Sequence, residues 1–271
     1  MKIFKNKDQL RREIGNKKSI SFVPTMGGLH KGHISLIKTA KKYTNETLVS
    51  IYVNPKQFNK KEDYKKYPRN LVKDLKILKK LKVNYLYLPT YKDLFKFKPF
   101  NRVYLHKFAN KLCGKYRKGH FKGVLDVVNR FLEIVRPKYL FLGLKDFQQL
   151  ILIKKHILKN KIVTKITSCK TVREPSGVAC SSRNFNLNKN QMKIAKDVFN
   201  YLIKIKKKTK KNLKLFDSTL FKKDLIKIGV NKIDYLEIIN RKTLEKPKKS
   251  NENFNIFIAY YLNKVRLIDN I

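Results

Sequence analysis

The chain of 271 residues contains no tryptophan and only three cysteines, three methionines, eight prolines and ten glycines. Cys113, Cys169 and Cys180 are widely spaced and form no C-x-x-C pair, which argues against both a disulfide framework and a zinc site. We expect three free thiols in a reducing compartment. No apolar run approaches the roughly 20 residues of a membrane-spanning helix, and the N-terminal MKIFKNKDQLRREIG lacks an apolar segment of signal-peptide length. These absences predict a cytoplasmic protein with no membrane partner and no metal-ligand set of its own.

Negative charge is also scarce, because 19 acidic residues face 65 basic ones and the net charge is +46. Such a balance is typical of nucleic-acid-binding proteins, which neutralise phosphates with cations. The basic residues, however, are 54 Lys and 11 Arg, and Arg is better suited to bidentate recognition of phosphate and guanine. The lysines are dispersed from Lys2 to Lys264. We therefore hypothesise that drift in genomic base composition has enriched the solvated surface in lysine, and we expect no specific nucleic-acid partner. The alternative is a basic RNA-binding protein.

An apolar content of 42%, with 17 Phe and 14 Tyr, is sufficient for an ordinary core. Short apolar runs predict strands at 19–24, 47–53, 83–89, 138–143 and 161–167. Helical spacing of apolar residues predicts helices at 33–43, from residue 71, at 124–135 and at 146–158. This alternation favours an α/β fold with a Rossmann-like, doubly wound parallel sheet. From about residue 171 the pattern is more polar and less regular, with a lysine-rich helix end or loop at 205–211, and a smaller α+β domain is expected there.

The stretch TMGGLHKGH, residues 25–33, holds three of the ten glycines and two of the five histidines directly after the first predicted buried strand. A strand, a glycine turn and a helix start together expose backbone N–H groups at the positive end of a helix dipole, which binds phosphate. Neither G-x-G-x-x-G nor a P-loop motif is present. His30 and His33 are three residues apart, so both imidazoles can reach one phosphate group. A metal pair would need a further ligand that the loop lacks.

The loop resembles the H-x-G-H signature of the superfamily that contains nucleotidylyltransferases and class I aminoacyl-tRNA synthetases. Further blocks, in the same order, are similar to those of one family within it, the pantoate–β-alanine ligases: VSIYVNPKQF, DYKKYPRN, GHFKGV, GLKDFQQL, TVREPSGVACSSRN, DYLEI and RLIDN. The resemblance covers nearly the whole chain. It implies that pantoate and ATP give pantoyl adenylate and pyrophosphate, after which β-alanine displaces AMP to give pantothenate. It also implies Mg²⁺ with the ATP, and a homodimer.

The same resemblance implies the roles of individual residues. His33, the family's proton donor, His30 and Lys145 match catalytic positions. Gln57 and Gln149 match the pantoate-binding glutamines, and Gln57 is also the expected β-alanine contact. The family's ATP contacts fall on Met26, Gly27, Gly28, Leu29, His30, Lys31, Gly32, His33, Gly143, Leu144, Lys145, Asp146, Val172, Cys180, Ser181, Ser182 and Arg183.

These blocks also contain further charged and apolar candidates. Arg117 and His120 are further candidates for the phosphate side of the site, while Arg69 is interpreted as structural. The apolar group on the helix 124–135 could pack the methyl groups of pantoate or be plain core: Val127, Val128 and Phe131. The implied division is a nucleotide-binding domain with the pantoate site over 1–170 and a smaller domain over 171–271 that closes over the ATP site.

Three positions depart from the family pattern. Leu144 and Lys31 stand where Glu is usual or common, and Cys180 replaces a usual Met. Where the backbone makes the contact, such changes affect ATP affinity more than the reaction. Two other enzyme classes of the superfamily fit less well. A nucleotidyltransferase for a phosphate ester would not need the paired glutamines or the SSRN run, and a class I synthetase would need additional chain to read tRNA.

Overall fold

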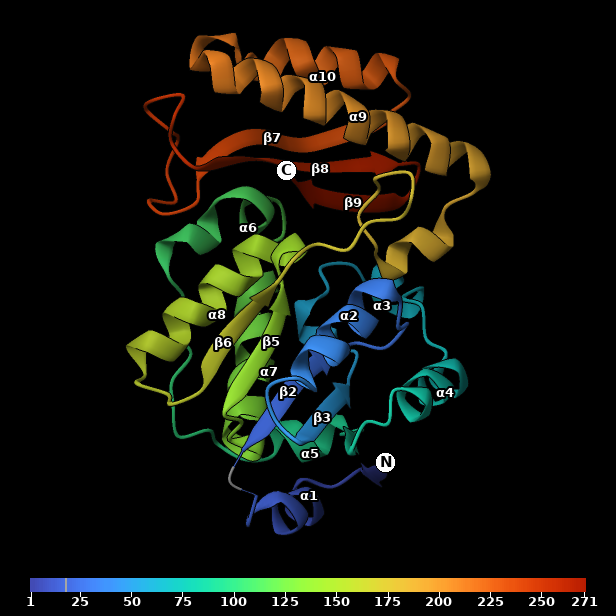
Figure 1. The fold of residues 1–271 in the computed structure, drawn as a ribbon, viewed down its shortest axis with the longest axis vertical. Coiled ribbons are helices and arrows are strands. Elements are labelled where there is room, and N and C mark those ends of the chain that lie inside the picture. Colours follow the sequence, from blue (N-terminus) through green and yellow to red (C-terminus); the bar gives the residue numbers. More distant parts are fainter. Residues whose placement is uncertain (18) are drawn as a thin grey trace. The chain divides into compact units, whose positions relative to one another are not determined.

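The computed structural model describes residues 1–17 and 19–271. It contains two compact units, Met1–Val172 and Arg173–Ile271 (Figure 1). In the first unit, six parallel strands form one sheet in the order β1-β4-β3-β2-β5-β6. The strands are β1 Lys2–Phe4, β2 Ile20–Thr25, β3 Glu46–Ile51, β4 Tyr85–Tyr87, β5 Tyr139–Gly143 and β6 Lys165–Cys169.

Helices connect these strands, as the doubly wound pattern predicted. They are α1 Lys7–Ile14, α2 Lys31–Ala40, α3 Lys61–Lys65, α4 Leu71–Lys80, α5 Tyr91–Phe95, α6 Leu112–Tyr116, α7 His120–Val135 and α8 Phe147–Lys159. Short 3-10 turns occupy Pro55–Gln57, Lys107–Asn110 and Leu144–Asp146. The predicted strand at 161–167 begins later, at Lys165, and β1 and α1 were not predicted.

The central strands β2 and β3 are buried on both faces because helices cover both faces of the sheet. Val23 of β2 packs in one core cluster with Ile37 of α2 and Leu78 of α4. Its neighbour Phe22 points to the opposite face and meets Phe131 of α7 edge-on, with ring centroids 5.6 Å apart. Successive side chains of a strand alternate between faces, and a parallel sheet buried on both sides reads as a continuous apolar run. The run SISFVP is such a case.

The order of strands reverses at β2, which pairs with β3 on one side and β5 on the other. In doubly wound sheets this reversal opens a crevice at the carboxyl ends of the two central strands, where ligands bind. The TMGGLHKGH loop follows β2 and the GLKD run follows β5. Both motifs therefore emerge at the same edge of the sheet, as the sequence indicated.

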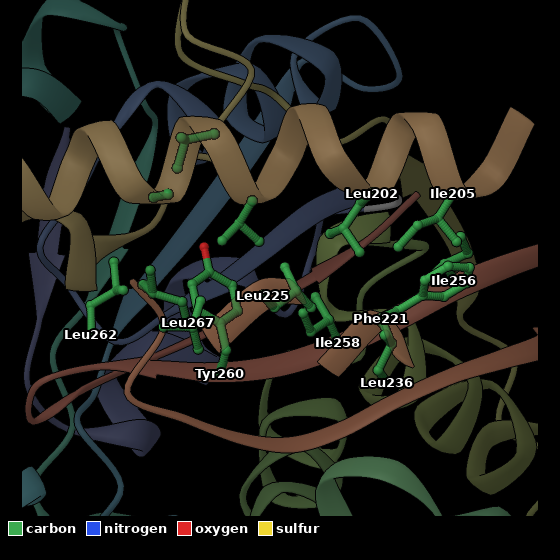
Figure 2. Packing of buried hydrophobic residues seen from close by; sticks show 14 of the residues in the cluster. Leu202, Ile205, Phe221, Leu225, Leu236, Ile256, Ile258, Tyr260, Leu262 and Leu267 are labelled. Atoms are coloured by element: carbon green, nitrogen blue, oxygen red, sulfur yellow. The ribbon is translucent and has the colours of Figure 1, made fainter. Parts of the chain in front are cut away.

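The second unit is a three-stranded antiparallel sheet with two helices packed on it. Its elements are α9 Lys189–Lys211, α10 Ser218–Lys227, β7 Lys232–Asn240, β8 Phe254–Leu262, β9 Val265–Asn270 and the 3-10 turns Ser182–Asn186 and Leu213–Leu215. Figure 2 shows Leu202 and Ile205 of α9 pointing from the helix toward the sheet residues Ile256 and Ile258. The segment is more regular than the sequence suggested, because the apolar stripe of α9 is interspersed with lysines. The lysine-rich run 205–211 is the end of this helix.

All three cysteines are buried free thiols, as expected. Across residues 1–17 and 19–271, no helix combines the length and apolar character needed to cross a membrane.

A buried histidine ties α7, α8 and an irregular segment together. Nδ1 of His156 accepts a hydrogen bond from the backbone N–H of Tyr104 at 3.1 Å, so the ring hydrogen lies on Nε2 and is donated to Asn129 Oδ1 at 3.0 Å. Asn129 in turn donates to the carbonyl of Asn101 at 2.8 Å. Burial lowers the pKa of His156 to about 4 from its usual 6.5. Folding therefore requires this imidazole to be neutral.

Stability should fall on acidification because of His156. At pH above 6.5 the imidazole is neutral in both folded and unfolded chains, but between pH 6.5 and about 4 only the unfolded chain binds the proton. We expect the free energy of unfolding to drop by up to about 3 kcal/mol over this range, at about 1.4 kcal/mol per pKa unit. Urea unfolding of wild type and His156→Gln at several pH values measures this drop. The variant should be less stable at pH 7 but less dependent on pH; equal pH slopes would contradict the assignment.

Candidate active site

The loop after β2 turns sharply because Gly27 and Gly28 have φ angles of 77° and 61°. Thr25, the last residue of β2, fixes the start of the turn. Its Oγ1 accepts from the N–H of Gly27 at 3.2 Å and donates to the Ser50 carbonyl of β3 at 2.8 Å. A Cβ added at Gly27 would lie 3.0 Å from a carboxylate oxygen of Asp74. Both the left-handed backbone and the lack of space therefore favour glycine here.

Asp74 receives the next two backbone amides of the loop. The N–H of Gly28 donates to Oδ2 at 2.9 Å and that of Leu29 to Oδ1 at 2.8 Å. The carboxylate is buried, which raises its pKa, while the two amides and the charge of Lys73 act in the opposite direction. These amides were expected to face a phosphate. In the structure they donate to the Asp74 carboxylate, so both buried N–H groups have an acceptor within the protein.

His30 and His33 cap the start of α2 reciprocally. Nδ1 of His30 accepts from the N–H of Gly32 at 3.1 Å, and Nδ1 of His33 accepts from the N–H of His30 at 3.4 Å. The ring centroids are 4.1 Å apart, so the predicted pairing of the imidazoles is confirmed. A nitrogen that accepts a hydrogen bond carries no hydrogen. Each neutral ring therefore has its hydrogen on Nε2.

The electrostatic surroundings keep His33 neutral. Burial, followed by the neighbouring His30 and Lys145, lowers the pKa of His33 well below its usual value. Lys145 belongs to the 3-10 turn after β5, and its Nζ lies 3.6 Å from Oδ1 of Asp146. The turn after β5 thus places a cation whose charge acts on the His33 imidazole.

Gln57 lies against the same loop from the turn that follows β3. Its Nε2 donates to the sulfur of Met26 at 3.0 Å, and its Oε1 accepts from Nδ2 of Asn54 at 3.3 Å. The side chain is buried. The structure therefore brings a residue predicted to bind pantoate and one predicted to bind ATP into direct contact.

Arg117 and His120 hold the backbone of Gln57. The Gln57 carbonyl accepts from Nδ1 of His120 at 2.7 Å and from Nη2 of Arg117 at 3.2 Å. Because a carbonyl can only accept, the His120 ring hydrogen lies on Nδ1. Its Nε2 is then the acceptor for Nη1 of Arg117 at 3.0 Å. Neither sequence spacing nor composition indicated this three-residue arrangement.

Gly123 lets α7 approach this turn closely. A Cβ at that position would lie 2.4 Å from the carbonyl oxygen of Lys56 and 3.0 Å from the backbone nitrogen of Gln57. Asn54 Nδ2 also donates to the Gly123 carbonyl at 3.0 Å. Helix α7 and the Gln57 turn are therefore packed backbone to backbone.

The two glutamines at the start of α8 have different surroundings. Gln148 is buried and donates to the carbonyls of Phe108 and Lys111 at 2.8 and 2.7 Å, so it orders the segment before α6. Gln149, the predicted pantoate contact, is half-buried in the first turn of α8, shortly after Lys145. On α7 three apolar side chains are buried: Val127, Val128 and Phe131.

The remaining predicted ATP contacts at residues 180–183 belong to the second unit. Cys180 Sγ lies 3.2 Å from Oε1 of Glu174. Ser181 Oγ accepts from the N–H of Arg183 at 3.2 Å, which caps the short 3-10 turn. Val172 is the last residue of the first unit.

Metal-binding side chains do not gather at the site. Within residues 1–17 and 19–271, the His, Cys, Asp and Glu side chains form no group of three or more that could hold a metal ion.

Comparisons with known proteins give a consistent result. The family model described as pantoate-beta-alanine ligase matches residues 2–271. The chain is 38% identical to a pantothenate synthetase from Thermosipho africanus over 273 residues, which cover 100% of the chain and 98% of that protein. Two solved structures are similar. One is a pantoate-beta-alanine ligase from Francisella tularensis complexed with beta-gamma ATP and beta-alanine, at 38% identity, with coverage of 100% and 97% and a TM-score of 0.84. The other is a pantothenate synthetase from Thermus thermophilus, at 29% identity, with coverage of 100% and 99% and a TM-score of 0.91.

The hydrogen positions on the imidazole pair can be measured directly. We expect ¹⁵N NMR at pH 7 to show neutral rings with hydrogen on Nε2 for both His30 and His33, because each Nδ1 faces a backbone N–H. His33 should stay neutral as the pH falls through 6.5. The urea-unfolded chain is the control, in which it should titrate normally. Hydrogen on Nδ1, or normal titration of His33 in the folded protein, would contradict this geometry.

Gly123→Ala should destabilise the protein by about 1–3 kcal/mol, the usual cost of overpacking, because the new methyl group overlaps the Lys56 carbonyl. Gly143→Ala is the matched stability control, since a Cβ there meets nothing within 4 Å. Urea unfolding of both variants measures the difference. Equal stabilities would show that the turn can move away from α7 at no cost.

Proposed function

The chain belongs to the pantoate-beta-alanine ligase family, and from this premise we propose how its residues carry out the reaction. The enzyme is an ATP-dependent ligase that joins pantoate to β-alanine. In the first step a carboxylate oxygen of pantoate attacks the α-phosphorus of ATP, and the bond from that phosphorus to its bridging oxygen breaks. Pyrophosphate leaves and pantoyl adenylate remains.

His30, His33 and Lys145 are the proposed catalytic residues. The observation that carries this assignment is the pair of capped imidazoles, each with its neutral-ring hydrogen on Nε2, in the field of the Lys145 ammonium. Donors fixed before the reaction stabilise charge that develops on phosphate oxygens, because they need not reorganise. Lys145 supplies the positive charge that phosphoryl transfer requires.

His33 is the proposed proton donor. Its pKa is lowered in the free protein by burial and by two neighbouring groups. Bound triphosphate adds negative charge, which favours the imidazolium and raises that pKa. His33 can then take up a proton at Nδ1, in exchange for the hydrogen bond from the His30 N–H, and transfer its Nε2 hydrogen to the leaving pyrophosphate oxygen.

Gln57 and Gln149 are the proposed pantoate contacts, and Gln57 also meets β-alanine. Amide groups can bind hydroxyl and carboxylate oxygens without adding a competing nucleophile. In the second step the amine of β-alanine attacks the acyl carbon of the adenylate, the bond to the AMP oxygen breaks and the nitrogen loses a proton. The support of Gln57 by Met26 and Asn54 favours a fixed amide at this position.

The wider ATP site is proposed from the sequence resemblance. In the loop and turn of the first unit it comprises Met26 to His33 and Gly143 to Asp146, with Val172 at the end of the unit. In the smaller domain predicted over 171–271, it comprises Cys180, Ser181, Ser182 and Arg183. At Gly28 and Leu29 the proposed contact with ATP does not involve the backbone N–H groups, because these groups donate to Asp74.

We propose that Mg²⁺ arrives with ATP and is held by its phosphates. The nearby carboxylates fit a separate metal site poorly, since both Asp74 oxygens accept backbone amides and Asp146 lies beside Lys145. The family resemblance further supports a cytoplasmic homodimer. The dispersed lysines are proposed to be solvated surface rather than a nucleic-acid site.

The reaction is tested by measuring AMP release from ATP, Mg²⁺ and D-pantoate, with and without β-alanine. Sustained release that requires both pantoate and β-alanine is expected. Folded protein that binds ATP but gives no AMP with both substrates would contradict the proposed function.

His33→Ala and Lys145→Ala should each lower the rate of adenylate formation by about 10²–10³-fold, the usual loss when one fixed donor is removed. Pyrophosphate release in a single turnover measures that step, and circular dichroism checks the fold. His106→Ala is a matched control, because its Nδ1 also accepts a backbone N–H, that of Phe108, at the start of a 3-10 turn. A full rate in either site variant would remove that residue from the mechanism.

A further inference from the structure

Asp74 is a buried acidic residue that no substrate assignment uses. It lies in the first turn of α4, where a helix dipole favours negative charge. Its side chain is 2% exposed, and its two oxygens accept the amides of Gly28 and Leu29 at 2.9 and 2.8 Å. Helix α4 otherwise contributes no residue to the site described above.

The two amides point at the carboxylate because of the backbone conformation. Gly27 and Gly28 both have positive φ, which directs consecutive N–H groups toward one side of the loop. In other nucleotide-binding proteins, glycine loops of this kind direct their amides at phosphate oxygens. Here a protein carboxylate takes the position of that anion, and it is close enough to Gly27 to leave no room for a side chain there.

The hydrogen bonds of Asp74 are directly linked to the imidazole pair. Leu29, the second donor to the carboxylate, is buried and immediately precedes His30. The N–H of His30 donates to Nδ1 of His33, and the N–H of Gly32 donates to Nδ1 of His30. A displacement of the Leu29 peptide therefore moves the backbone donor that orients His33.

We propose that Asp74 is a positioning residue, which occupies the glycine-loop amides and so assigns recognition of the ATP phosphates to the side chains of His30, His33 and Lys145. The inference rests on the proposed ATP site. In this arrangement the Asp74 carboxylate stays bound to the two amides when the nucleotide binds. In a loop whose amides bind phosphate, the nucleotide itself is the acceptor.

Asp74→Asn is the test, because an amide is nearly the same size but has only one acceptor oxygen. Its NH₂ group would face one of the two backbone N–H donors and leave that donor unsatisfied. We expect the KM for ATP to rise about tenfold or more and the rate of adenylate formation to fall, with the Kd of pantoate within twofold of wild type. Unchanged ATP kinetics in a folded variant, with an active wild type, would overturn the inference. An inactive wild type would instead contradict the proposed function.

Asp93→Asn is the matched control. Asp93 is a half-buried carboxylate in the same unit that accepts the N–H of Lys7 at 3.0 Å and bonds to the hydroxyl of Tyr87. This variant should lose stability but retain the KM for ATP. A similar rise in KM would indicate a general effect of destabilisation and overturn the inference.

Hydrogen exchange of the wild-type protein supplies a measurement that does not depend on a variant folding. The Gly28 and Leu29 amides should exchange slowly without nucleotide and remain slow when ATP and Mg²⁺ are added without pantoate. Fast exchange that becomes slow only with ATP would show that phosphate, not Asp74, is their acceptor, and would overturn the inference.

Discussion

A backbone turn outside helices and strands must find acceptors for its buried amides, and at the glycine loop that acceptor is the carboxylate of Asp74. The rest of the site is arranged around this interaction. It fixes the peptide before His30, and the reciprocal cap with His33 then fixes both rings. The position of the imidazoles thus depends on a helix that follows the third strand along the chain. Local sequence preferences alone would leave the glycines free to adopt several conformations.

The candidate donors are held in place by hydrogen bonds within the protein. The imidazole hydrogens have a defined position, and Gln57 is held at both its amide and its carbonyl. Such fixed dipoles stabilise developing charge because they need not reorganise during the reaction. This fixed geometry depends on close packing of the backbone. At Gly123, for example, the packing leaves no room for an added methyl group.

The sequence was sufficient to predict the doubly wound sheet and the placement of the two motifs, because buried strands and helix faces have short-range periodic patterns. It also predicted the pairing of the imidazoles, which follows from a three-residue spacing on a helix start. The partnership of Asp74 with the loop could not be predicted in this way, since the residues are 45 and 46 positions apart and no local pattern links them. The same holds for His120, whose contact with Gln57 depends on how α7 packs. A smaller α+β unit was predicted, but its individual helices and strands were not, because the core positions of α9 are separated by lysines that lowered its average apolar character.

The Gln57 turn has a consequence for how related chains can be recombined. Its backbone is bound by Arg117 and His120 and packed against Gly123, although about 60 residues of chain lie between. A chimera of two related enzymes with its crossover between residues 58 and 116 would take the turn from one parent and its support from the other. Small differences in backbone position between the two parents would then displace the Gln57 amide, which is proposed to hold pantoate. Segments 54–57 and 117–123 should therefore come from the same parent, although they are far apart in the sequence.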